Sequence, residues 1–183
     1  MTDPLQLLSQ IAKGDKESFA LLYGQYSTMV YNVALGFSHE TVLAEEITQA
    51  VFTKVYTKAD TFKGNSAVKT WIYRIAVTTS LNAVKQRQRK QTASLEHVDV
   101  VMYDHPGVQL ENKEKARYLA VAVERLPDTQ RTAFVLSLVE GRPRQEVADI
   151  MDTSLKAVES LLQRAKASLR KTLAEYYPER RKL

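Results

Sequence analysis

Residues 66 to 92 carry six basic side chains and no Asp or Glu. Apolar residues recur through this stretch with the period of a helix, about 100° per residue. The face that we expect to be buried consists of Val68, Trp71, Ile72, Ile75, Ala76, Thr79 and Ala83. A long helix whose charges are all positive has two interpretations: it binds a polyanion, or it is a solvated surface helix.

A short polar segment, Lys63-Gly64-Asn65-Ser66, precedes this helix. It is predicted to form a turn, because its glycine can adopt a positive φ and its Asn or Ser can cap the helix. The outer side of the helix collects charge, hydroxyl and amide groups at Arg74, Thr78, Asn82 and Lys85. A nucleic acid could lie against these groups.

The composition excludes several kinds of site. The chain has no cysteine and three histidines at unsuitable spacings, so we expect no disulfide, no metal and no cofactor. An enzyme is not indicated, because the sequence lacks a Gly-rich phosphate loop, a nucleophile elbow and a metal constellation. No apolar run is long enough to cross a bilayer and residues 1 to 10 do not form a leader, so we expect a cytoplasmic protein without membrane insertion.

The 183 residues suffice for one domain or two small ones, and the basic residues are concentrated in two places. Residues 1 to 65 carry five basic and seven acidic side chains, and residues 93 to 128 carry four and seven. Residues 129 to 183 carry eleven basic and seven acidic side chains, so the last third is a second positive block. This distribution indicates two separate contact surfaces.

Three helices are predicted before the basic one. Pro4 starts a short helix, which Gly14 and Asp15 end. A second helix runs from near Glu17 to Phe37, and a third from about Thr41 to Lys58. Their apolar residues repeat at i, i+3 and i+4, and the expected core is Phe19, Leu22, Tyr23, Tyr26, Val30, Val33, Ala34, Phe37, Val42, Leu43, Ile47, Val51, Val55 and Tyr56.

The third predicted helix also has a polar side. Glu45, Glu46, Gln49 and Phe52 lie within two turns of one another. Two carboxylates can perform acid-base catalysis, but adjacent residues on a helix point in different directions and no nucleophile is suggested. A protein-docking face and a plain solvated surface are the remaining interpretations.

The helical period is lost between residues 92 and 112, where small, acidic and apolar residues surround a Pro-Gly pair. Such a stretch is a linker or a functional loop, and we interpret it as a flexible linker between two domains. Residues 95 to 103 have strand propensity, but a lone strand has no partner. The period returns from Glu114, and the expected apolar face is Ala116, Leu119, Ala120, Val123 and Leu126.

The next predicted helix begins after Pro127 and is ended by Gly141, with Asp128 or Thr129 as its cap. Two further helices follow. Pro143 opens a short one over residues 144 to 151.

The final predicted helix follows a turn at Asp152-Thr153-Ser154, whose serine can cap it. Its apolar face is Val158, Leu161, Leu162, Ala165 and Leu169. Two helices joined by such a turn, with the small Ala148 at their crossing, form a helix-turn-helix.

The outer side of the final helix offers the groups that a recognition helix needs, at Lys156, Glu159, Ser160, Gln163 and Arg164. Gln163 could form hydrogen bonds with adenine, and Glu159 could accept a hydrogen bond from cytosine. Arg164 would contact phosphate. Similar helix pairs also occur as structural hairpins, but the basic excess favours DNA binding.

Three segments taken together, residues 44 to 56, 62 to 89 and 126 to 171, closely resemble the extracytoplasmic-function (ECF) group of bacterial sigma factors. The resemblance implies a non-enzymatic transcription initiation subunit with an all-α fold. Its two small helical domains would cover residues 1 to 91 and 113 to 183, joined by a linker over residues 92 to 112. An anti-sigma factor is an implied partner besides core RNA polymerase and promoter DNA.

The resemblance also implies roles for residues. The first domain would bind core RNA polymerase through Glu45, Glu46, Gln49 and Phe52. It would open the promoter element nearest the start site with Lys63, Asn65, Ser66, Trp71, Arg74, Thr78, Asn82 and Lys85. The second domain would recognise the more distant element with Lys156, Glu159, Ser160, Gln163 and Arg164.

This sequence departs from the common pattern of the group in places. Thr78 replaces a frequent Asn, Glu159 stands where basic residues are frequent, and Asp152 replaces a turn Gly while tolerating the left-handed conformation. Two other interpretations remain open. One is a free-standing helix-turn-helix regulator that binds operators without polymerase, and the other is a helical RNA-binding or adaptor protein.

Overall fold

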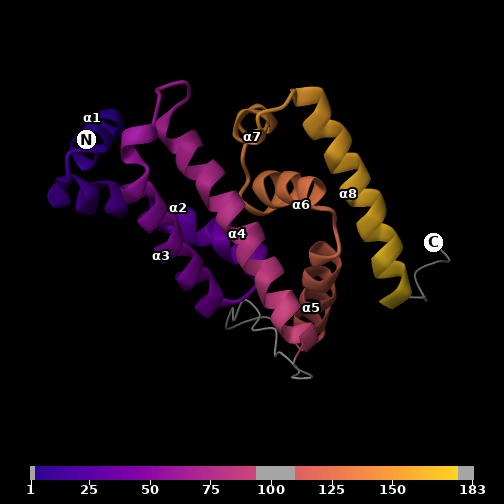
Figure 1. Ribbon diagram of the computed structural model, residues 1–183. Helices are drawn as coiled ribbons and strands as arrows, with labels where there is room; N and C mark the ends of the chain where they lie inside the picture. The colour runs from indigo at the N-terminus through magenta and orange to yellow at the C-terminus, as the bar shows by residue number, and fades with distance from the viewer. Residues whose placement is uncertain (1–2, 94–109, 177–183) are drawn as a thin grey trace. The chain divides into compact units, whose positions relative to one another are not determined.

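The computed structural model describes residues 3–93 and 110–176. Within these residues the chain forms helices joined by short turns, and no β-strand occurs among them. The chain divides into two compact units, residues 1–94 and 95–183 (Figure 1). The predicted all-α fold with two small helical domains is confirmed.

The described residues of the first unit form four α-helices and one 3₁₀ turn: α1 (Pro4–Ile11), α2 (Lys16–Ser38), α3 (Thr41–Thr57), the turn Ala59–Thr61 and α4 (Val68–Ala93). Helix α2 packs against α1, α3 and α4, and α3 packs against α4 (Figure 1). The core therefore lies between these helices, and the helix positions predicted from the sequence are confirmed.

Aspartate side chains cap the starts of α1 and α2. Asp3 caps α1 by accepting from the Leu5 N–H at 3.2 Å. Asp15 caps α2 by accepting from the N–H groups of Glu17 and Ser18 at 3.3 and 3.1 Å. The Ser18 hydroxyl and these backbone donors stabilise the charged form, so the pKa of Asp15 is lowered.

Three residues predicted to lie in the core are exposed. Tyr23 is 43% exposed, Val42 58% and Tyr56 37%. The buried stripe of α3 instead runs through Leu43, Ala44, Ile47, Thr48, Val51, Phe52 and Val55. On a helix with 3.6 residues per turn, Val42 and Tyr56 lie beside this stripe rather than on it.

The buried face of α4 also differs from the predicted one. Tyr73, Val77 and Val84 are buried, whereas Trp71, Ile75 and Ala83 are only partly buried. The physical reason is that α4 packs against both α2 and α3, so it buries a wider face, rotated from the single stripe of an amphipathic helix.

The second unit contains α5 (Leu110–Glu124), α6 (Asp128–Phe134), a π-helical turn (Val135–Val139), α7 (Arg144–Met151) and α8 (Leu155–Tyr176). Helix α8 packs against α5, α6 and α7. Residues 92 and 93 of the predicted linker belong to α4, and residues 110–112 belong to α5. The remainder of the linker and the alternative strand at 95–103 lie outside the described residues.

The helix predicted after Pro127 differs in detail. Pro127 occupies the cap position, so Asp128 starts the helix and neither Asp128 nor Thr129 caps it. Its last turn widens into a π-turn closed by the hydrogen bond from the Glu140 N–H to the Val135 carbonyl, at 2.9 Å.

Two residues of α5 also differ from the prediction. Leu119 and Ala116 are exposed, although the helical period of the sequence predicts that they are buried.

Candidate functional site

The turn between α7 and α8 forms a helix-turn-helix, as the sequence predicts. Asp152 adopts the left-handed conformation, with φ 52°, and the Thr153 N–H donates to the Ala148 carbonyl at 3.0 Å. Ala148 is fully buried, so the helices approach closely there. The Ser154 hydroxyl oxygen accepts from the Ala157 N–H at 3.2 Å and caps α8.

The outer side of α8 presents the five residues predicted to face DNA. Lys156, Glu159, Gln163 and Arg164 are exposed, and Ser160 is partly exposed. The opposite side is buried at Val158, Leu162, Ala165 and Leu169, whereas Leu161 is only partly buried. The helix therefore has one exposed polar face and one buried apolar face.

Arg144 is a residue of this face that the sequence did not reveal. Its Nη1 atom donates to Oε1 of Glu159 at 3.3 Å. Arg144 begins α7 and precedes Glu159 by fifteen positions, so no helical spacing links the two. Only the packing of α7 on α8 brings them together.

The polar turn before α4 is held against that helix by two aromatic rings. The centroids of Phe62 and Trp71 are 5.3 Å apart, with the ring planes at 59°. Gly64 has φ 72°, as predicted for this turn. Lys63 and Asn65 are exposed and Ser66 is partly exposed, but Ala67 directly precedes the helix in the cap position expected of Asn65 or Ser66.

The predicted DNA-facing residues of α4 share one side of the helix. They follow one another at intervals of three or four residues, which places them along one face. Thr78, Asn82 and Lys85 are exposed, whereas Trp71 and Arg74 are partly buried. The Thr78 hydroxyl donates to the Arg74 carbonyl at 2.9 Å, which holds its side chain against the helix.

Three of the four residues expected to form the docking face are exposed on α3: Glu45, Glu46 and Gln49. The prediction that Phe52 lies on this outer side is wrong, because Phe52 is only 2% exposed. Its ring centroid lies 4.5 Å from that of Tyr23 on α2, so it packs between the helices. Tyr23 covers it from outside, which explains why Tyr23 itself is exposed.

Open hollows flank these side chains. Glu46 lines one of about 310 Å³ between α3 and α4, and Glu45 lines one of about 340 Å³ between α2 and α3. A third hollow, of about 610 Å³, is lined by Phe52, Tyr23, Tyr56 and other side chains of α2 and α3. Gln49 lines both hollows between α2 and α3 and stands at their boundary.

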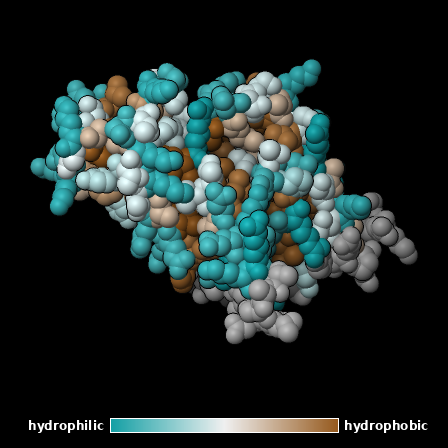
Figure 2. Space-filling model, viewed as in Figure 1, coloured by the Kyte–Doolittle hydropathy of each residue, from teal (hydrophilic) through white to brown (hydrophobic). Residues whose placement is uncertain are grey.

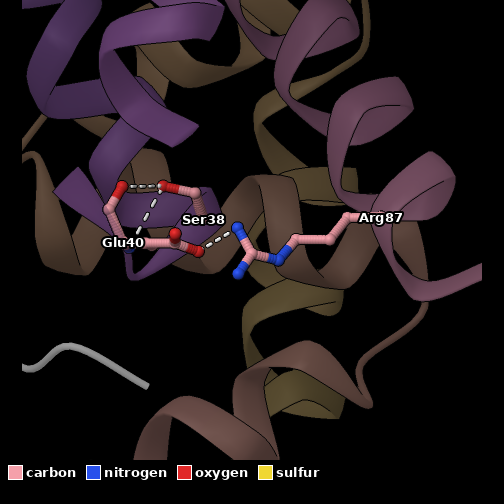
Figure 3. A network of polar contacts seen from close by, with 3 residues as sticks. All are labelled: Ser38, Glu40 and Arg87. Atoms are coloured by element: carbon pink, nitrogen blue, oxygen red, sulfur yellow. Dashed lines mark hydrogen bonds and ion pairs between the residues drawn. The ribbon is translucent and has the colours of Figure 1, made fainter. Parts of the chain in front are cut away.

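An ion pair joins the later turns of α4 to the start of α3. The Arg87 guanidinium reaches the Glu40 carboxylate, and both side chains are partly buried (Figure 3). The Ser38 hydroxyl donates to the Glu40 carbonyl at 3.0 Å and accepts from the Glu40 N–H at 3.3 Å. One cation of the basic helix is therefore structural, which the sequence pattern did not distinguish.

Hydrophilic residues cover much of the face shown in Figure 2, with hydrophobic residues in smaller patches between them. Among the described residues, no three His, Asp or Glu side chains are grouped so that they could hold a metal ion. Nor does any helix in residues 3–93 or 110–176 have the length and apolar character needed to span a membrane.

Comparison with known proteins identifies two family regions. The chain matches Sigma-70 region 2 over residues 22–90 and Sigma-70 region 4 over residues 116–169. RNA polymerase sigma-H factor of Pseudomonas aeruginosa is 30% identical over 178 residues, covering 92% of each chain. ECF RNA polymerase sigma-E factor of Escherichia coli is 28% identical over 179 residues, covering 92% of this chain and 93% of the relative.

Two solved structures share the fold. CnrH, in complex with the cytosolic domain of CnrY, has a TM-score of 0.65 and 19% identity over 93% of this chain and 97% of its own. RpoE of Bartonella quintana, with the anti-sigma factor NepR, has a TM-score of 0.63 and 21% identity over 86% and 97%. Because the two family regions occur in order and the sequence identity spans almost the whole length, this chain belongs to the extracytoplasmic-function group of the sigma-70 family.

Proposed function

We propose that this chain binds core RNA polymerase and directs it to a promoter, which it recognises at two elements and helps to open. The observation that carries the proposal is the pair of polar, cation-bearing helix faces, one on α4 and one on α8. Each face lies on a helix whose opposite side is buried, and each belongs to a different unit. Such an arrangement can hold one DNA molecule at two places.

The surface proposed for polymerase docking is the outer side of α3. Glu45, Glu46 and Gln49 are exposed there and face hollows on both sides of the helix. Carboxylates beside shallow hollows suit a partner helix with basic side chains, because charge complementarity directs association and apolar contact adds affinity. Phe52 would contribute indirectly, because its buried ring packs against the exposed ring of Tyr23.

The surface proposed for promoter opening is the turn at 62–66 together with the outer side of α4. Unstacking a base costs a few kcal/mol, and a pocket that holds the extruded base offsets that cost. Lys63, Asn65 and Ser66 offer polar groups in the turn, and the Phe62–Trp71 pair fixes its position. Along the helix, Arg74, Thr78, Asn82 and Lys85 would contact the separated strand.

The surface proposed for the distant promoter element is the outer side of α8. In a helix-turn-helix the second helix enters the major groove, where Gln and Ser side chains can bond base edges. Gln163 and Ser160 are the candidates for base contacts, whereas Lys156 and Arg164 would contact phosphates.

Regulation by an anti-sigma factor is part of the proposal. The two solved relatives are complexes, one with the cytosolic domain of CnrY and one with the anti-sigma factor NepR. A partner of this kind would inactivate the chain by covering its docking or DNA-binding surfaces.

The chain would act in the cytoplasm beside the polymerase. It would contribute no catalytic residue, because RNA synthesis takes place in the polymerase itself.

The deciding experiment is transcription in vitro with purified core RNA polymerase on a library of promoter templates. We expect transcripts only when this chain is added, and weak binding of the isolated chain to duplex promoter in a gel shift. Tight duplex binding without polymerase, together with no transcript, would instead establish a free-standing helix-turn-helix regulator.

A further inference from the structure

Glu159 is an unusual residue for a surface that meets DNA. It is the only acidic side chain among residues 155 to 174 of α8, and it lies between Lys156, Ser160 and Gln163 on the outer side. On a surface that binds DNA, a carboxylate would be repelled by the phosphates, unless it accepts a hydrogen bond from a base edge or is neutralised by a cation.

The structure supplies the cation. Arg144 Nη1 lies 3.3 Å from Glu159 Oε1, and the side chains remain 57% and 46% exposed. A guanidinium carries five N–H donors, and this bond uses one of them. Arg144 is therefore bound to the carboxylate and still accessible to a ligand in solution.

The position of Arg144 indicates which part of DNA it would meet. It is the first residue of α7, the first helix of the helix-turn-helix. In that motif the first helix crosses the DNA backbone while the second lies in the groove. Guanidinium groups bind phosphate oxygens well, because the fork of N–H donors matches their geometry.

We infer that Arg144 is a phosphate-contacting residue of the distant-element surface, and that Glu159 orients it instead of reading a base. The inference rests on the proposed function and extends it. The pair turns a repulsive carboxylate into a support for a cation, so Arg144 and Glu159 act as one unit on the DNA face. Two helices, and not α8 alone, then form this surface.

The test uses holoenzyme reconstituted from core RNA polymerase and the full chain. The probe is a set of promoter duplexes randomised across the distant element, and both the retained fraction at increasing salt and the enriched sequences are measured. Arg144→Ala should weaken retention about three- to tenfold without changing the enriched bases. The slope of log affinity against log salt should fall by about one, as for one lost phosphate contact.

Variants of the pair distinguish a phosphate contact from a purely structural role. Arg144→Lys should keep the salt slope, because it keeps the charge. In a Glu159→Gln background, the loss of promoter retention caused by Arg144→Ala should be about two- to fivefold smaller. The reason is that the substituted side chain has no negative charge to repel the DNA when Arg144 is removed. Lys13→Ala, which removes one exposed cation from the turn after α1, is the charge-matched control and should leave the slope unchanged.

Two results would overturn the inference. One is an unchanged salt slope in Arg144→Ala, whether or not the melting temperature falls, since a purely structural role affects stability alone. The other is a changed base preference in Glu159→Gln at a single position, which would make Glu159 a base reader. If the unsubstituted chain forms no holoenzyme or enriches no sequence, the proposed function fails and the inference falls with it.

Discussion

Helices α4 and α8 both present polar faces with positive charge, but they are buried in different ways. Helix α4 packs against α2 and α3 and buries neighbouring positions, such as Ile72 with Tyr73 and Ala76 with Val77. Helix α8 buries a narrower stripe through Val158, Leu162, Ala165 and Leu169. Between Val68 and Val84 the exposed part of α4 is therefore a narrow strip, whereas α8 keeps a broad outer side.

The difference bears on what each face could bind. A narrow strip continued by the turn at 62–66 suits a single strand, which needs a track of contacts along one line. A broad face suits the major groove of a duplex, which admits a whole helix. It also leaves room for a second helix to contribute, as Arg144 does from α7.

The largest expected effect concerns the deeper burial of α4. Tyr73→Ala removes a buried ring and should lower the free energy of unfolding of the first unit by about 3–5 kcal/mol. Trp71 is the only tryptophan of the chain, so its fluorescence during urea unfolding reports on this unit. Leu162→Ala in the second unit is the control. It should leave the urea midpoint of the Trp71 fluorescence change where it is in the unsubstituted chain. An equal shift would mean that the two units unfold together.

The next prediction separates the narrow strip from the docking face. Arg74→Ala and Lys85→Ala should each reduce promoter opening by about tenfold while core binding is kept, because each removes a cation that we propose contacts the separated strand. Permanganate footprinting measures opening, and a pull-down measures core binding. Glu46→Lys is the converse variant and should weaken the pull-down. Equal losses in both assays for all three variants would indicate misfolding instead of separate surfaces.

A smaller effect is expected at the start of α8. Ser154→Ala removes the acceptor for the Ala157 N–H and should destabilise the second unit by about 1 kcal/mol. Hydrogen exchange of the first amides of α8 should become faster, while Trp71 fluorescence stays unchanged. Ser154→Thr keeps an acceptor and should restore protection. Unchanged exchange in Ser154→Ala would show that the cap does not hold the helix end.

The smallest expected effect is the dependence of the first unit on pH. The pKa of Asp15 is lowered by its bonds to the Ser18 hydroxyl and to backbone N–H groups. Its charged form therefore stabilises the fold above the ordinary value of 3.8, and this contribution is lost as the pH falls through the lowered pKa. Asp15→Asn keeps a capping side chain but removes the charge. The urea midpoint followed by Trp71 fluorescence should therefore change less in this variant as the pH is lowered. Identical acid profiles would show that the charge of Asp15 does not stabilise the first unit.

Local chemistry determines which parts of the fold could be predicted. Pro4, Gly14 and the left-handed Asp152 mark helix ends through backbone constraints that depend on few neighbours. The polar side of α8 follows from its own period, because one side of that helix is buried.

Residues that contact two elements could not be assigned in this way. Phe52 follows the spacing of Glu45 and Gln49, yet it is buried because Tyr23 of α2 covers it. Arg87 looks like any other cation of α4 until Glu40 is found beside it. A period describes one helix, and it cannot tell which neighbour will cover a given side.

The sequence by itself determined the helices, the helix-turn-helix and the two concentrations of positive charge, since each depends on residues within a few turns. Tertiary structure alone decided the wide buried face of α4, the burial of Phe52 and the pairing of Arg144 with Glu159. These features depend on contacts between residues distant in the chain, and such contacts exist only when the helices have packed.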